Sequence, residues 1–216
     1  MRTSLRITTF NLENLDDKPG QVPTLDERIA VMRPQLIRLN ADVLCLQEIH
    51  GQETPGEPRR LLALQRLLED TPYADYHVAS TKLVDGSQVY DVRNLVILSR
   101  FEIVEQTQHK HEFAPAPQYR KVTTRPAEMV AQEITWERPL LYAEVRLPDG
   151  RSLHVVNVHL KSKRPSRIEG QQLNRYAFRT ASGWAEGFFI SALKRVGQAL
   201  ETRLFIDSLF DADEQA

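Results

Sequence analysis

The chain has 216 residues, a mass of 24.8 kDa and a formal net charge of −1 at pH 7. Its 41% hydrophobic and 26% charged residues are typical of a globular protein and exclude a disordered or fibrous chain. The near-neutral charge lacks the basic excess of a dedicated nucleic-acid-binding protein. No run approaches the ~18 apolar residues of a membrane span, and the start has no apolar leader. We therefore expect one cytoplasmic domain over residues 1–216.

The first part of the sequence predicts a strand, a helix and a second strand. Apolar and polar residues alternate over Leu5–Phe10, which indicates a strand with two different faces. Thr24 and Glu27 match a capping box, and the apolar spacing after them predicts a helix to about Asn40. The apolar run Ala41–Ile49 predicts a central strand that is buried on both faces.

Further elements follow along the chain. We expect a helix over 61–68 and strands over 73–79, 94–98 and 101–104. The proline-containing segment 106–137 predicts a long loop or an irregular edge strand. Two strands, over 140–147 and 152–160, flank a turn that contains Asp149-Gly150, a strong hairpin signal. From Trp184 onward, apolar residues at helical spacing predict a long amphipathic helix.

The only cysteine is Cys45, which excludes an internal disulfide. Because it lies within the apolar run of the predicted central strand, we expect a buried and unreactive thiol.

Polar residues stand where three of the predicted strands end, at Asn11, at Gln47-Glu48 and at Asn157 with His159. In the strand predicted over 152–160, Asn157 and His159 share one face about 7 Å apart. Such a strand leaves an apolar core and enters a cleft. The ordinary alternatives are a hydrogen-bonded polar pair at a rim and, for Glu48, an exposed surface carboxylate.

Four motifs in order resemble those of the endonuclease/exonuclease/phosphatase superfamily. They are Thr9-Phe10-Asn11-Leu12, Ala41-Asp42-Val43-Leu44-Cys45-Leu46-Gln47-Glu48, Leu95-Val96-Ile97-Leu98-Ser99-Arg100 and Val156-Asn157-Val158-His159-Leu160-Lys161-Ser162. Each motif alone is a weak signal, but their order, spacing and strand context agree. The resemblance covers residues 7–162.

The resemblance implies a DNase I-like α/β fold: a four-layer α-β-β-α sandwich with mixed, mostly antiparallel sheets. By the same resemblance, Glu48 and Asn11 hold a divalent metal, Mg²⁺ with Mn²⁺ as the alternative, which prefers such oxygen ligands. His159, Asn157 and Arg138 are implied as the catalytic residues at the scissile phosphate. Basic residues after His159 are expected to line the approach of an anionic substrate, namely Lys161, Lys163 and Arg164.

The sequence departs from the family pattern in its last part. The family continues with Gly-Asp-Phe-Asn and ends with Ser-Asp-His, but no Gly-Asp, Ser-Asp or Asp-His dipeptide occurs here. By resemblance, those segments hold the group that activates water, and no substitute is evident. We therefore expect a domain that lacks its C-terminal strands, is inactive alone, and pairs with the missing segment or with a second copy.

Three functions stay open. The first is Mg²⁺-dependent phosphoester hydrolysis by in-line attack of activated water, as a nuclease or phosphodiesterase, with nucleic acid as the possible substrate. The second is a phosphatase of a small or lipid-linked phosphate. The third is a non-catalytic binding module on the same scaffold. A salt series separates the first two, because binding to a polymeric phosphate falls steeply with salt.

Overall fold

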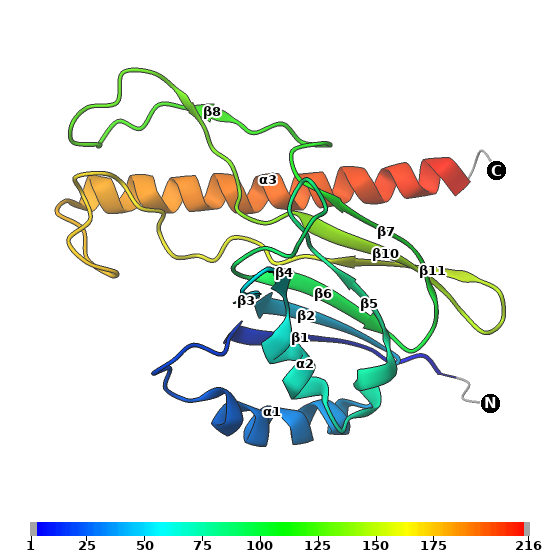
Figure 1. Cartoon of the computed structure of the whole chain (residues 1–216). Helices are drawn as coiled ribbons and strands as arrows, with labels where there is room; N and C mark the ends of the chain where they lie inside the picture. The colour runs from blue at the N-terminus through cyan, green and yellow to red at the C-terminus, as the bar shows by residue number, and fades with distance from the viewer. Residues whose placement is uncertain (1–3, 214–216) are drawn as a thin grey trace. The chain divides into compact units, whose positions relative to one another are not determined.

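The structure is a computed structural model that describes residues 4–213. The chain divides into two compact units (Figure 1). Unit 1 comprises the described residues up to Gln108 together with Arg138–His159. Unit 2 comprises His109–Glu137 and the described residues from Leu160 onward. The single domain over 1–216 stays a prediction, and the two units are described separately.

Unit 1 contains a four-stranded sheet in the order β1-β2-β6-β5. Its strands are β1 (Ile7–Leu15), β2 (Val43–Ile49), β6 (Asn94–Ser99) and β5 (His77–Ser80). β1 and β2 are parallel, whereas β2, β6 and β5 pair in antiparallel fashion. The helices α1 (Leu25–Leu39) and α2 (Leu62–Leu68) contribute to one apolar core with one face of this sheet. As predicted, β2 is almost wholly buried.

A second sheet of unit 1 has the order β11-β10-β7. Its strands are β7 (Ile103–His109), β10 (Leu140–Arg146) and β11 (Ser152–Asn157). β10 and β11 form the predicted hairpin, and Gly150 in its turn has a φ of 86°. A second apolar core joins the two sheets, with Cys45 and Ile97 from one and Ala143 and Val155 from the other. Unit 1 therefore has helices, sheet and sheet in three layers (Figure 1). The protein has a mixed α/β fold, and the four-layer sandwich stays a prediction.

The start of α1 follows the predicted capping box. The amide of Thr24 donates to Oε2 of Glu27 at 2.8 Å, and the amide of Glu27 donates to Oγ1 of Thr24 at 3.3 Å. The helix continues through Pro34 and ends at Asn40, whose φ of 46° is left-handed. These features define where the helix begins and ends.

Some elements differ from the sequence predictions. The strand expected over 73–79 is wrong in its first half, which forms the 3-10 helix η1 (Pro72–Asp75) before β5. Thr71 caps this turn by accepting from the amide of Tyr73, and proline suits the first helical position. The hairpin of β3 (Gln52–Thr54) and β4 (Glu57–Arg60) was not predicted, because its short strands are polar and give no apolar period.

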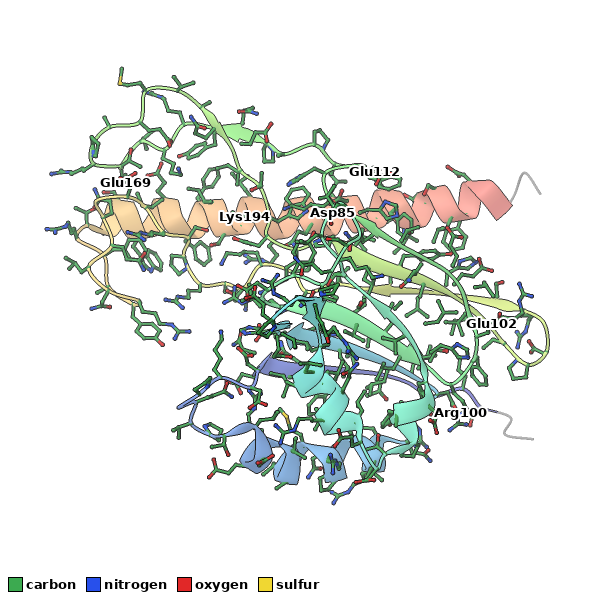
Figure 2. The ribbon with its side chains drawn as sticks, viewed as in Figure 1. Asp85, Arg100, Glu102, Glu112, Glu169 and Lys194 are labelled. Carbon is green, nitrogen blue, oxygen red and sulfur yellow. The ribbon has the colours of Figure 1, made fainter. Side chains whose placement is uncertain are left out.

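Unit 2 is built on α3 (Ala181–Asp213), the predicted C-terminal helix. In the segment 106–137, which was expected to be a long loop or an irregular edge strand, residues 106–109 belong to β7. The rest is mostly irregular and contains the short pair β8 (Gln118–Tyr119) and β9 (Gln132–Glu133). Ile134, Ile168 and Ile190 form an apolar core in this unit. Lys194, which is labelled on α3 in Figure 2, donates to Oε1 of Glu137 at 2.8 Å. Among the described helices, none has the length and apolar character needed to cross a membrane.

Candidate functional site

The predicted site lies at the edge of the four-stranded sheet that is formed by strand ends, where β1 and β2 end and β6 begins. Several residues there have a positive φ. Glu48 at the end of β2 has a φ of 61°, and Glu13, Asn14 and Arg93 also have positive φ. The register pairs Asn11 with Gln47 and Ile49 with Asn94, so these segments meet at the same edge. Left-handed conformations are sparsely populated by residues other than glycine, and they cluster at functional sites.

Glu48 and His159 come together at this edge. Nε2 of His159 lies 3.6 Å from Oε1 of Glu48, and both side chains are partly buried. The sequence places these residues in different motifs, and the fold makes them neighbours. The strand predicted over 152–160 would contain His159. β11 ends at Asn157, so His159 lies just beyond the strand.

The charge state of His159 follows from its surroundings. Burial lowers the pKa of its imidazole, and the positive charges of Arg138 and Arg93 act in the same direction, whereas the Glu48 carboxylate opposes them. A lowered pKa favours the neutral imidazole near pH 7. Nδ1 of His159 is buried and has no hydrogen-bond partner in the structure. The Glu48 carboxylate is therefore not neutralised by a permanent imidazolium.

Arg138 contacts the same segment through the backbone. Its Nη1 donates to the carbonyl oxygen of His159 at 3.3 Å. This contact places a guanidinium next to the imidazole and explains its effect on the pKa of His159. The predicted phosphate contact of Arg138 stays a prediction.

Asn157 joins strands of both sheets behind the site. Its Nδ2 donates to the carbonyl oxygens of Leu46 and Val96, each at 3.0 Å, and its Oδ1 accepts from Nε2 of Gln47 at 2.8 Å. Only 3% of the residue is exposed. Through these bonds the end of β11 is linked to β2 and β6. Its expected role at the scissile phosphate stays a prediction.

Asn11 lies on the strand next to Glu48 and is exposed. Its Oδ1 accepts from the amide of Glu13 at 2.7 Å. An amide oxygen has two lone pairs, so one remains for a further partner.

The residues at this edge fit a magnesium ion that keeps most of its waters. Within the described part of the chain, no group of three or more His, Cys, Asp and Glu side chains is placed to hold a metal. Mg²⁺ does not require such a group, because one or two carboxylates with waters and substrate phosphate complete its shell. Glu48 offers the carboxylate and Asn11 an amide oxygen.

A second polar network at this edge was missed by the sequence analysis. Asp16, just after β1, accepts from Nε2 of Gln52 at 2.9 Å and lies 2.9 Å from both Nδ1 of His50 and Nζ of Lys18. Burial alone would raise the pKa of Asp16, but these hydrogen bonds outweigh it and lower the pKa to about 2. Asp16 has no apolar period or motif around it that could have signalled this role.

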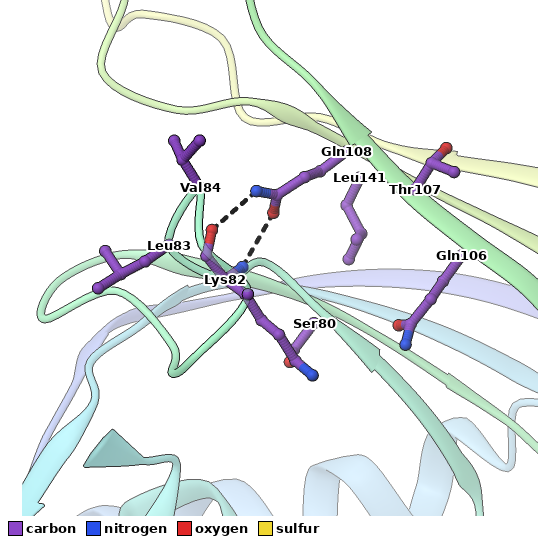
Figure 3. A pocket seen from close by; sticks show the side chains of 9 residues that line it. Ser80, Lys82, Leu83, Val84, Gln106, Thr107, Gln108 and Leu141 are labelled. Atoms are coloured by element: carbon purple, nitrogen blue, oxygen red, sulfur yellow. Dashed lines mark hydrogen bonds between the residues drawn. The ribbon is translucent and has the colours of Figure 1, made fainter. Parts of the chain in front are cut away.

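A separate cavity of about 220 Å³ opens beside β7 in unit 1 (Figure 3). The side chain of Gln108 closes one side of it by two bonds to Lys82: Oε1 accepts from the amide at 2.9 Å, and Nε2 donates to the carbonyl oxygen at 2.7 Å. None of the predicted site residues lines this cavity.

The sequence matches no protein-family model and no curated protein. Solved structures do match. An endonuclease/exonuclease/phosphatase family protein from Leptotrichia buccalis C-1013-b matches 72% of this chain and 55% of its own, with 15% identity and a TM-score of 0.45. The humanized D. rerio TDP2 matches 74% and 49%, with 22% identity and a TM-score of 0.44. The mannosyl-6-phosphatase Bt3783 of Bacteroides thetaiotaomicron VPI-5482 matches 73% and 52%, with 16% identity and a TM-score of 0.47.

This chain spans about half the length of each of these three proteins. The Leptotrichia protein is named as a member of the family whose motifs the sequence resembles. The matches to endonuclease/exonuclease/phosphatase proteins extend over about 73% of the chain.

Proposed function

We propose that this protein is a magnesium-dependent phosphoester hydrolase of the nuclease or phosphodiesterase type. The observation that carries the proposal is the meeting of Glu48 and His159, 3.6 Å apart, at a sheet edge with left-handed backbone. A carboxylate beside a largely neutral imidazole offers a hard oxygen ligand and a hydrogen-bonding group to one phosphate.

In this proposal each residue has a defined task. A bound Mg²⁺ would supply neutralisation of charge at the phosphate oxygens. Glu48 and Asn11 would hold the ion, and His159 would contact a phosphate oxygen on which charge develops during in-line attack by water. Asn157 keeps β2, β6 and β11 in register, and Arg138 fixes the backbone of His159. The cooperation of these residues in hydrolysis rests on the motif resemblance and on the contacts given above.

Metal binding is the first test. Calorimetry with Mg²⁺ and Mn²⁺ should show weak binding by the wild type and its loss in Glu48→Gln, because the charged ligand is removed. Glu13→Gln is the matched control, since Glu13 is an exposed carboxylate on the neighbouring strand β1. Equal binding by wild type and Glu48→Gln would remove Glu48 from this role.

Turnover is the second test. The substrates are bis-p-nitrophenyl phosphate, plasmid DNA and small phosphomonoesters with Mg²⁺. We expect no appreciable turnover by these 216 residues alone, because no acid-base group has been assigned, and turnover by an extended chain that carries the two absent motifs. In that active chain, His159→Ala should lower kcat by ~10²-fold or more. Glu48-dependent turnover by a monomer of these 216 residues would contradict the expectation of inactivity.

A phosphatase of a small or lipid-linked phosphate is the second candidate, and the net charge of −1 favours it over a processor of long nucleic acids. The two differ in salt dependence. Affinity for a polymeric substrate should fall steeply between low and physiological salt, and affinity for a single phosphate should change little.

A further inference from the structure

A short hairpin in unit 2 precedes α3 and presents an ordered tip. Gln172 and Phe178 form a β-bridge, and the amide of Leu173 donates to the carbonyl oxygen of Ala177 at 2.9 Å. At the tip, Oδ1 of Asn174 accepts from the amides of Tyr176 at 2.9 Å and Ala177 at 3.0 Å. An asparagine that bonds the backbone two residues ahead stabilises a turn. The tip conformation is thus defined by its own hydrogen bonds.

The base of this hairpin is anchored in the core of unit 2. Gln171 is 2% exposed, and its Oε1 accepts from the hydroxyl of Thr180 at 2.8 Å while its Nε2 donates to the carbonyl oxygen of Thr123 at 2.5 Å. Phe178 packs against the isoleucine cluster of the unit. The exposed tip is therefore held on a buried support.

The tip carries an exposed aromatic ring with two guanidinium groups close to it. Tyr176 is 79% exposed, and the Cζ atoms of Arg164 and Arg175 lie 5.2 and 5.6 Å from its ring centroid. Nη2 of Arg164 also donates to the carbonyl oxygen of Arg175 at 2.6 Å, which fixes the first guanidinium beside the ring. Most of the ring surface remains open to solvent.

The surrounding segment is strongly basic, in contrast to the whole chain. Within residues 160–180 the only acidic residue is Glu169, and the basic residues are Lys161, Lys163, Arg164, Arg167, Arg175 and Arg179. The chain as a whole has a net charge of −1, so this excess is local. A local basic excess attracts polyanions.

We propose that this hairpin tip binds single-stranded nucleic acid, with a base stacked on Tyr176 and the adjacent phosphates at Arg164 and Arg175. An exposed aromatic ring combined with basic side chains is what unpaired bases and their phosphates require. A duplex offers no free base face to the Tyr176 ring, because its bases are stacked on one another. The inference goes beyond hydrolysis and does not depend on it, since all of its residues belong to unit 2.

The test is fluorescence anisotropy with a labelled oligothymidylate, in EDTA and at low salt. Tyr176→Ala should weaken binding about tenfold, because stacking on one aromatic side chain contributes ~1–3 kcal/mol per base. Tyr176→Trp should retain the affinity. Phe210→Ala is the matched control, because Phe210 is an exposed aromatic residue of α3, and it should have no effect.

Charge and stacking are separated by two further comparisons. Arg175→Ala should weaken binding and lower its salt dependence, whereas Arg38→Ala, an exposed arginine of α1 in unit 1, should not. An abasic oligonucleotide of the same length should bind more weakly. Its affinity for Tyr176→Ala and for wild type should be the same.

The proposal is overturned if Tyr176→Ala binds the oligonucleotide as well as wild type does. It is equally overturned if a duplex, heparin or vesicles with anionic lipid compete better than the single strand at equal charge. Because EDTA removes the divalent ion, failure of binding here is distinguishable from failure of the proposed hydrolysis: either can occur while the other holds.

Discussion

Nδ1 of His50 lies 2.9 Å from Oδ2 of Asp16, and this pair joins the segments that follow the two parallel strands β1 and β2. The backbone supports the same junction, since the amide of His50 donates to the carbonyl oxygen of Leu15 at 2.9 Å. His50 lies two residues after Glu48, so the buried Asp16 carboxylate fixes, through His50, the segment that presents Glu48.

Acid should weaken this junction. The pKa of Asp16 is about 2 in the folded protein and 3.8 ordinarily, so ionised Asp16 stabilises the fold by about 2 kcal/mol above pH ~4. That stability is lost as the pH falls from about 4 to about 2. Urea unfolding at pH 7 and pH 3 should show a smaller pH effect for Asp16→Asn than for wild type. Asp75→Asn, at an exposed carboxylate, should behave as wild type. Identical pH dependence in Asp16→Asn would contradict this assignment.

Asn157 and Asn11 should differ in how much they contribute to the free energy of unfolding. Asn157→Ala leaves Nε2 of Gln47 and two backbone carbonyls without their buried partner, so we expect a loss of about 2–4 kcal/mol in the free energy of unfolding. Asn11→Ala removes an exposed side chain and should change stability by less than about 1 kcal/mol. Urea titration at pH 7 measures both. Equal losses would show that the buried network of Asn157 contributes little.

Gly197 of α3 should not tolerate alanine. A Cβ there would lie 2.5 Å from Cζ3 of Trp136, a buried ring whose Nε1 donates to Glu201 at 3.0 Å. Alanine normally stabilises a helix by ~1 kcal/mol over glycine, but overpacking costs about 1–3 kcal/mol, so Gly197→Ala should lower the melting temperature. The comparison is Ala199→Gly at an exposed position, where alanine should be the more stable residue. A higher melting temperature for Gly197→Ala would show that Trp136 moves freely.

Cys45 should resist thiol reagents in the folded protein. Burial raises the pKa of its thiol to about 11, and only the thiolate reacts. At pH 8 this lowers the thiolate fraction by about 100-fold relative to a free cysteine. Reaction with 5,5′-dithiobis(2-nitrobenzoate) should be slow in buffer and fast in urea, with no other cysteine to contribute. Equal rates would place the thiol at the surface.

The sequence predicted the long elements because their apolar patterns are strong. The capped helix α1, the buried strand β2, the β10-β11 hairpin and the helix α3 all appear where their patterns placed them. The prediction failed for Tyr73–Asp75, where a threonine cap and a proline favour a turn over the expected strand. Local capping chemistry is decided by one or two hydrogen bonds, which a periodicity does not record.

The site was predictable in its residue types and less so in its contacts. Strand-end position singled out Glu48 and His159, and the fold brings them to 3.6 Å. The position of Arg93 at the same edge had no signal, because it depends on a left-handed turn before β6. The partnership of Gln47 with Asn157 likewise depends on how two sheets pack, which no local pattern encodes.

The bonds of Asn157 also bear on the order of folding. Its side chain bonds residues 61 to 111 positions away in the sequence, across two sheets that form from separate hairpins and strands. Contacts of such high sequence separation carry a large loop-closure entropy and tend to form slowly. Glu48 lies on β2 of one sheet and His159 follows β11 of the other, so neither sheet alone brings the two side chains together. Their 3.6 Å separation therefore requires that both sheets have docked.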